Sequence, residues 1–198
     1  MEKIKTYNDS YTVTQEQKDF YDENGYLLIK GVWSKEEVDL LRKDMDDHAD
    51  GHWTNNLDTH YYKNWKRLHR GKKMCDIGDA LMNGERVVPI GSIAFFCKPD
   101  NKLEHGSIWH QDNYAGKCHD GSHYLNLAVP IDNADETNGS LKVIPGSHKL
   151  GMLPCKPKAN FEVDDQGRLY QAAPIGNNCE VPKDLPIVQL NYEAGDVM

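Results

Sequence analysis

The pattern of hydrophobic and polar positions divides the chain into a helical first part and a β-rich second part. From Arg86 onward, short β-rich runs are separated by clusters of Gly, Pro, Asn and Asp, which is the pattern of short strands joined by turns. These runs are Val87–Phe96, Gly106–His110, Tyr124–Ile131, Leu141–Ile144 and Ile187–Leu190. Helices followed by strands predict an α+β domain, in which helices pack outside a mainly β core built as a sandwich or barrel.

The first predicted helix covers Gln15–Asn24. Thr14 and Gln17 form a capping-box pattern at its start, because each can bond the other's backbone N–H. Gly25 is a natural stop at its end. The following residues, Tyr26–Ile29, predict a short strand.

A second capping box, Ser34 with Glu37, opens a predicted helix over Lys35–Ala49. Its apolar residues fall three or four positions apart and form one stripe, which we expect to pack in the core: Val38, Leu41, Met45 and Ala49. The segment His52–Arg70 is aromatic and polar without a clear period, so it predicts irregular structure with some helix. That segment either packs on the core or crosses the mouth of a site. Lys73–Met82 predicts a further helix.

Composition and charge narrow the class of protein. The 198 residues suit one domain with one hydrophobic core. The net charge of −8 argues against a nucleic-acid partner, because phosphate groups attract basic surfaces. No apolar run reaches the roughly 18 residues of a membrane span, and the N-terminus lacks the apolar core of a signal peptide. The five cysteines are widely spaced without a Cys-x-x-Cys pair, which predicts a reducing, cytoplasmic location.

The strongest chemical signal is the segment His110-Gln111-Asp112. On a strand, residues two apart point to the same face, so His110 and Asp112 would project together and Gln111 would point the other way. An imidazole and a carboxylate on one face can share a metal ion, and two histidines with one carboxylate form the facial triad of non-haem Fe(II) oxygenases. His-x-Asp alone occurs by chance in many chains. Its β-rich context, with Trp109 and Tyr114 beside it to exclude water, favours a metal site here.

Several longer motifs resemble the phytanoyl-CoA dioxygenase family. They are Gly25-Tyr26-Leu27, Phe95-Phe96-Cys97-Lys98-Pro99, His110-Gln111-Asp112, the acidic turn Pro130–Leu141 and Pro145-Gly146-Ser147-His148-Lys149. They follow the family's order and spacing along nearly the whole chain. The resemblance implies a double-stranded β-helix, which is a jelly-roll barrel supported by N-terminal helices. We therefore interpret residues 1–198 as a single domain of this type.

The same resemblance implies an Fe(II)- and 2-oxoglutarate-dependent oxygenase. Such an enzyme uses O2 to hydroxylate a small or medium organic substrate and releases succinate and CO2. The resemblance makes His110 and Asp112 metal ligands and catalytic residues, and it makes Lys98 and Asn126 candidates for contacting 2-oxoglutarate. Lys98 has a plain alternative as a surface lysine at a strand end. Halogenating relatives replace the carboxylate with a small residue, so Asp112 favours oxygenation.

Other histidines and basic residues are not assigned to the metal. The resemblance implies that His148 is structural and closes a turn after a strand. Cys118, His119 and His123 lack the spacing of a zinc site and are interpreted as a polar loop. The basic run between Lys63 and Lys73 predicts a solvated helix face, with an anionic substrate as the alternative.

One metal ligand of the family has no counterpart in the sequence. In the family, the second histidine and an arginine for the distal carboxylate of 2-oxoglutarate follow a Gly-Asp step. Gly195-Asp196 matches that step, so we expect both residues, with the last strands and helix of the domain, beyond Met198. Alternatively, the chain is a remnant that no longer catalyses, or another histidine or subunit completes the site. The alternative function is a non-catalytic jelly-roll binding module. Substrate identity and oligomeric state are not readable from the sequence.

Overall fold

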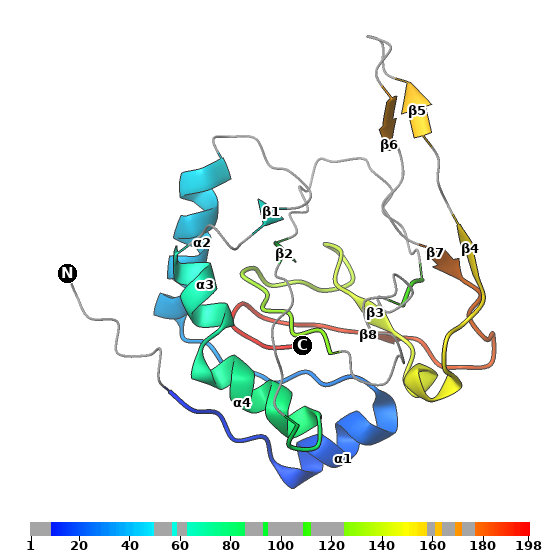
Figure 1. Ribbon diagram of the computed structural model, residues 1–198, viewed down its shortest axis with the longest axis horizontal. Coiled ribbons are helices and arrows are strands. Elements are labelled where there is room, and N and C mark those ends of the chain that lie inside the picture. The colour runs from blue at the N-terminus through cyan, green and yellow to red at the C-terminus, as the bar shows by residue number, and fades with distance from the viewer. Residues whose placement is uncertain are drawn as a thin grey trace.

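A computed structural model describes residues 9–49, 57–58, 63–85, 93–94, 109–111, 125–157, 161–163, 169–171 and 177–198 (Figure 1). Its helices are α1 (Gln15–Asn24), α2 (Lys35–Ala49), α3 (Lys63–His69), α4 (Lys72–Leu81) and the short 3-10 helix η4 (Ser147–Leu150). Its strands are β1 (Leu57–Asp58), β2 (Ile93–Ala94), β3 (Lys142–Val143), β4 (Cys155–Pro157), β5 (Phe161–Val163), β6 (Leu169–Gln171), β7 (Asn177–Cys179) and β8 (Val188–Gln189).

Helices α1 and α2 begin at the two capping boxes that the sequence predicts. The Gln17 backbone N–H donates to the Thr14 hydroxyl at 3.2 Å, and the Thr14 N–H donates to the Gln17 side chain at 2.9 Å. Ser34 and Glu37 repeat the arrangement at 3.3 and 2.8 Å. Helix α1 ends at Gly25, which has a left-handed φ of 76°. Because these signals are local, the observed bounds of both helices equal the predicted ones.

A buried carboxylate from α2 caps the N-terminus of α3. Asp44 is 8% exposed and accepts hydrogen bonds from the backbone N–H groups of Asn64 (2.7 Å) and Trp65 (3.1 Å). First-turn N–H groups have no partner inside their own helix, so Asp44 caps α3 from outside. The Trp65 indole N–H also donates to the Leu41 carbonyl at 3.2 Å. The predicted segment His52–Arg70 therefore contains a helix that long-range contacts hold.

The basic run between Lys63 and Lys73 does not form one solvated face. The lysines and the arginine of α3 are exposed, as predicted. Lys73 is different: its side chain is 13% exposed and its Nζ lies 3.0 Å from Glu37, which is 1% exposed. Lys73 also donates to the Val32 carbonyl at 3.1 Å. A buried carboxylate requires a partner, so the expectation of a solvated face is wrong for Lys73.

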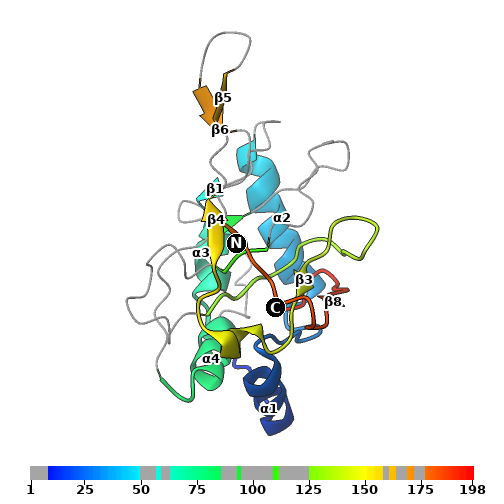
Figure 2. The same cartoon turned by 90° about the vertical axis from the view of Figure 1, so that its right-hand side faces the viewer.

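The described strands form four antiparallel pairs, β1–β2, β3–β8, β4–β7 and β5–β6. Strands β2, β3 and β8 lie within the predicted runs Val87–Phe96, Leu141–Ile144 and Ile187–Leu190. The sequence did not predict the pairs β4–β7 and β5–β6. The β5–β6 hairpin projects from the rest of the chain in two perpendicular views (Figures 1 and 2).

The segment 195–198 lies between two other extended segments. Val197 exchanges two backbone hydrogen bonds with Ile29, of 2.8 and 2.9 Å. Met198 exchanges two with Ala128, also of 2.8 and 2.9 Å. The predicted strand Tyr26–Ile29 therefore contributes one paired residue. The described part of Tyr124–Ile131 is not a regular strand, but its backbone still pairs with the segment 195–198.

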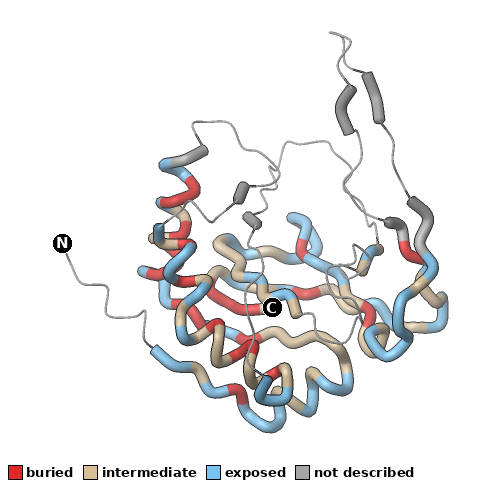
Figure 3. Tube along the Cα trace, in the orientation of Figure 1, coloured by how far each residue is buried: buried red, intermediate tan, exposed pale blue. Residues whose placement is uncertain are grey.

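One hydrophobic core joins helices α2, α3 and α4 to the segment 195–198, and Figure 3 shows buried positions along these segments. The predicted stripe of α2 is confirmed at Val38, Leu41 and Met45, which are 4%, 2% and 1% exposed. The side chain of Ala49 lies outside the described residues. Five partly buried residues pack against the core from the other half of the chain: Leu125, Leu127, Val129, Ile131 and Ala194. The double-stranded β-helix stays a prediction.

Candidate metal centre

The segment that carries His110 is attached to β7 through its backbone. The Cys179 N–H donates to the Trp109 carbonyl at 2.7 Å, so Trp109 lies beside the last residue of β7. Strand β7 in turn pairs with β4. His110 is therefore held one residue away from a fixed backbone contact. A metal ligand benefits from such a position, because its geometry is set before the ion binds.

Gln111, the residue after His110, is fixed by hydrogen bonds of its own side-chain amide. Its Nε2 donates to the Gly151 carbonyl at 3.0 Å, and its Oε1 accepts from the Leu153 N–H at 2.8 Å. The amide thus joins the segment to the turn after η4. Burial alternates along the segment, since Trp109 and Gln111 are partly buried and His110 is exposed. The structure assigns no strand to residues 109–111, and the placement of His110 and Asp112 on one metal-binding face stays a prediction.

The structure describes two of the four predicted site residues. His110 is exposed, and it has an interaction partner. Asn126 is exposed too, between the partly buried Leu125 and Leu127, so it faces away from the core. Asp112 and Lys98 lie outside the described residues. Within the described ranges, no three His, Cys, Asp or Glu side chains gather as a metal site would require.

The Gly195-Asp196 step is a buried junction rather than a plain strand start. Asp196 is 2% exposed and accepts hydrogen bonds from Lys30 Nζ (2.8 Å), Gly31 N–H (2.9 Å) and Glu193 N–H (2.8 Å). Burial raises the pKa of Asp196, but these donors outweigh burial and hold the pKa below the ordinary aspartate value. The carboxylate therefore ties the segment after α1 to the segment 195–198. Sequence reasoning missed this role, because Gly31 and Lys30 lie 165 and 166 positions away.

The Pro-Gly-Ser-His-Lys motif docks on the C-terminal end of α1. The Gly146 N–H donates to the Asn24 carbonyl at 2.9 Å, and His148 Nε2 lies 3.1 Å from the Asp22 carbonyl oxygen. Lys149 pairs with Glu23 at 2.8 Å. The last carbonyls of a helix lack partners inside the helix, and α1 has no basic residue in its last turn. From a distant part of the chain, the motif supplies hydrogen-bond partners for these carbonyls and a basic residue near the end of the helix. This agrees with the structural role expected for His148.

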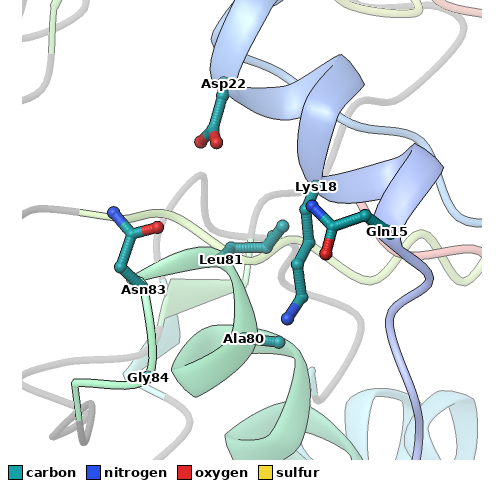
Figure 4. A pocket seen from close by; sticks show the side chains of 7 residues that line it. All are labelled: Gln15, Lys18, Asp22, Ala80, Leu81, Asn83 and Gly84. Atoms are coloured by element: carbon teal, nitrogen blue, oxygen red, sulfur yellow. The ribbon is translucent and has the colours of Figure 1, made fainter.

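A separate small cavity lies between α1 and the end of α4 (Figure 4). It measures about 340 Å³ and is lined by Gln15, Lys18, Asp22, Ala80, Leu81, Asn83 and Gly84. Its lining contains none of the predicted metal or 2-oxoglutarate residues. The cavity therefore gives no support to a ligand role at the predicted site.

The chain belongs to the phytanoyl-CoA dioxygenase family, whose family model, "Phytanoyl-CoA dioxygenase (PhyH)", matches residues 63–198. It is similar to the "Probable alpha-ketoglutarate-dependent hypophosphite dioxygenase" of Stutzerimonas stutzeri, with 26% identity over 155 residues. That alignment covers 68% of this chain and 53% of the relative, so the chain spans about half the length of the curated relative it matches. Among the described residues, no helix is long and apolar enough to cross a membrane. The predicted family is confirmed, and so is the resemblance to 2-oxoglutarate-dependent dioxygenases.

Proposed function

We propose that the protein is an Fe(II)- and 2-oxoglutarate-dependent oxygenase that hydroxylates a small or medium organic substrate and releases succinate and CO2. One observation carries the proposal: the chain belongs to this family, and two separate contacts fix its His-x-Asp segment. The Trp109 carbonyl is bonded to β7, and the Gln111 amide is bonded to the turn 151–153.

The donor set at this segment fits a divalent iron ion. His110 supplies an imidazole and Asp112 a carboxylate, and this combination is typical of non-haem Fe(II) sites. Iron bound there would activate dioxygen in the presence of 2-oxoglutarate. The exposure of His110 is consistent with this role, since a ligand must face the space that the ion enters. Gln111 would keep the two ligands on one side by holding its own side chain on the other.

Two further residues are proposed to bind the cosubstrate. Lys98 would attract a carboxylate of 2-oxoglutarate as a point charge. Asn126 would offer an amide from the face of its segment that lies opposite the core. The proposed jelly roll would place both beside His110. The antiparallel pairing of every described strand pair supports that fold, because a jelly roll is built from antiparallel strands.

The test measures iron content and succinate formation separately, in the 198-residue chain and in the longest natural protein that contains it. We expect Fe(II) to bind and 2-oxoglutarate to be converted to succinate in the natural protein. His110→Ala should lose iron, whereas His123→Ala, a control in the predicted polar loop, should keep it. Full iron occupancy without succinate would favour the binding-module alternative. Equal iron content in wild type and His110→Ala would refute the metal assignment.

A further inference from the structure

Several lysines of the described helices have an aspartate four positions later, and all but one of these couples form an ion pair. In each paired couple the ammonium nitrogen lies 2.6 Å from a carboxylate oxygen, and the couples are Lys35–Asp39, Lys43–Asp47 and Lys72–Asp76. The remaining couple, Lys18 and Asp22 of α1, forms no ion pair with each other or with another described residue. Residues four apart are neighbours on a helix surface, so the spacing alone does not explain why Lys18 and Asp22 stay apart.

Lys18 and Asp22 instead line the cavity between α1 and the end of α4. In Figure 4 the Lys18 side chain extends away from Asp22 toward Ala80, and the side chain of Leu81 lies between the two charged ends. Lys18 is partly buried and Leu81 is 6% exposed, so the two charges stand at either side of an apolar surface. The cavity therefore presents an ammonium group and a carboxylate, held apart, to a molecule that enters it.

The other wall of the cavity includes a turn whose backbone is held in place. The Gly84 N–H donates to the Asp79 carbonyl at 2.7 Å, and the Glu85 N–H donates to the Met82 carbonyl at 3.0 Å. Asn83 has a left-handed φ of 55°, which no other described residue except glycine adopts. Asn83 lines the cavity, and its side-chain amide makes no hydrogen bond with a described residue. The amide can therefore both donate to and accept from a ligand.

We propose that this cavity binds a small zwitterion, with the carboxylate of the ligand on Lys18 and its ammonium group on Asp22. The volume of about 340 Å³ lies within the range of small-molecule sites, roughly 300–1,000 Å³. A zwitterion fits better than a simple ion, because an anion bound to Lys18 is repelled by Asp22 and a cation bound to Asp22 is repelled by Lys18. The site shares no residue with the candidate metal centre, so the proposal goes beyond the oxygenase activity.

The experiment titrates the natural protein that contains this chain with glycine, β-alanine, γ-aminobutyrate and δ-aminovalerate, in which the two charges are separated by increasing numbers of carbon atoms. Binding is followed by heteronuclear NMR. We expect the signals of Lys18, Asp22 and Asn83 to move in a saturable way with at least one of these zwitterions. The acid and the amine that each lack one charged group of the best zwitterion should bind about 10-fold or more weakly, because each loses a charge-assisted hydrogen bond.

Two substitutions of nearly unchanged size test the two charges separately. Lys18→Gln and Asp22→Asn should each weaken binding of the best zwitterion about 10-fold or more. Lys35→Gln and Asp39→Asn are matched controls, because they remove the same charges at the same spacing from α2, outside the cavity. Both controls should leave the affinity unchanged.

Three outcomes would overturn the proposal. The first is that none of the zwitterions moves the signals of Lys18, Asp22 and Asn83 in a saturable way. The second is that the acid or the amine binds as tightly as the zwitterion, since the cavity would then recognise only one charge. The third is that Lys18→Gln and Asp22→Asn both bind as tightly as wild type. The wild-type titrations decide the first two outcomes without any variant.

Discussion

Substitution of Gly25 tests the docking of the Pro-Gly-Ser-His-Lys motif on α1. Gly25 has a φ of +76°, and a Cβ added there would lie 2.5 Å from Cγ and 2.9 Å from Cε1 of His148. Such separations are too short for carbon atoms, which pack at about 3.5–4.0 Å. The imidazole of His148 would have to move, and its 3.1 Å contact with the Asp22 carbonyl would be lost.

The expected cost of Gly25→Ala has two parts. The left-handed backbone conformation costs a residue with a Cβ about 1–2 kcal/mol, and loss of the His148 hydrogen bond costs about 0.5–1.5 kcal/mol. Gly84 is a matched control, because it also follows a helix and has a φ of +81°, but it has nothing within 4 Å of the added Cβ. Gly84→Ala should therefore show the backbone cost alone, and Gly25→Ala should be less stable by about 1 kcal/mol more.

Urea unfolding, followed by tryptophan fluorescence and far-UV circular dichroism, measures both variants. In a His148→Ala background, Gly25→Ala should cost no more than Gly84→Ala, since the ring that it displaces is gone. This coupling between Gly25 and His148 separates their contact from the backbone effect. If Gly25→Ala and Gly84→Ala lower the free energy of unfolding equally in the wild-type background, the docking of His148 on α1 contributes no stability and the reasoning is refuted.

Three further predictions concern polar side-chain contacts. Asp196→Asn should lower the free energy of unfolding by about 1–3 kcal/mol at pH 7. The folded-state pKa of Asp196 is lowered, so its contribution to the free energy of unfolding is complete above the unfolded pKa of about 3.9 and is lost as the pH falls through the folded pKa. The difference in stability between wild type and Asp196→Asn should therefore disappear in acid. A difference that does not change with pH would contradict this. Lys73→Met should destabilise by about 3 kcal/mol in urea unfolding by leaving the buried Glu37 carboxylate without an opposite charge, and Glu37→Gln added to it should restore part of the loss. Gln111→Leu should weaken Fe(II) binding roughly 10-fold in anaerobic titration, as loss of an orienting contact does, and unchanged affinity would remove Gln111 from the proposed site.

The parts of the fold that the sequence predicts are those whose signals lie within a few residues. Thr14 with Gln17, and Ser34 with Glu37, are three positions apart, and each pair fixed the start of a helix correctly. The start of α3 could not be predicted in this way, because its cap, Asp44, lies 20 positions before Asn64. Choice among distant partners depends on how the whole chain packs, which a local pattern does not encode.

The same distinction applies to the candidate site. The prediction that His110 and Asp112 form a pair rests on strand alternation, which a short motif can indicate. The contacts of the intervening Gln111 are not encoded locally, because Gln111 reaches Gly151 and Leu153, which are 40 and 42 positions away. The basic run was misread at Lys73 for the same reason, since Glu37 lies 36 positions before it.

The family match begins at residue 63, whereas the hydrophobic core already includes residues before that position, beginning with Val13. Val13 and Leu41 are 6% and 2% exposed and share one cluster with Val197, which is 1% exposed. Val197 also pairs with the Ile29 backbone, and Asp196 accepts from the Gly31 N–H, so the segment between α1 and α2 is joined to the segment 195–198 by both packing and hydrogen bonds. Gly195 completes the junction, because a Cβ at its φ of +93° would lie 2.5 Å from the Trp33 carbonyl oxygen. The Gly-Asp step therefore allows two distant segments to approach, and the hydrogen bonds of Asp196 then hold them together.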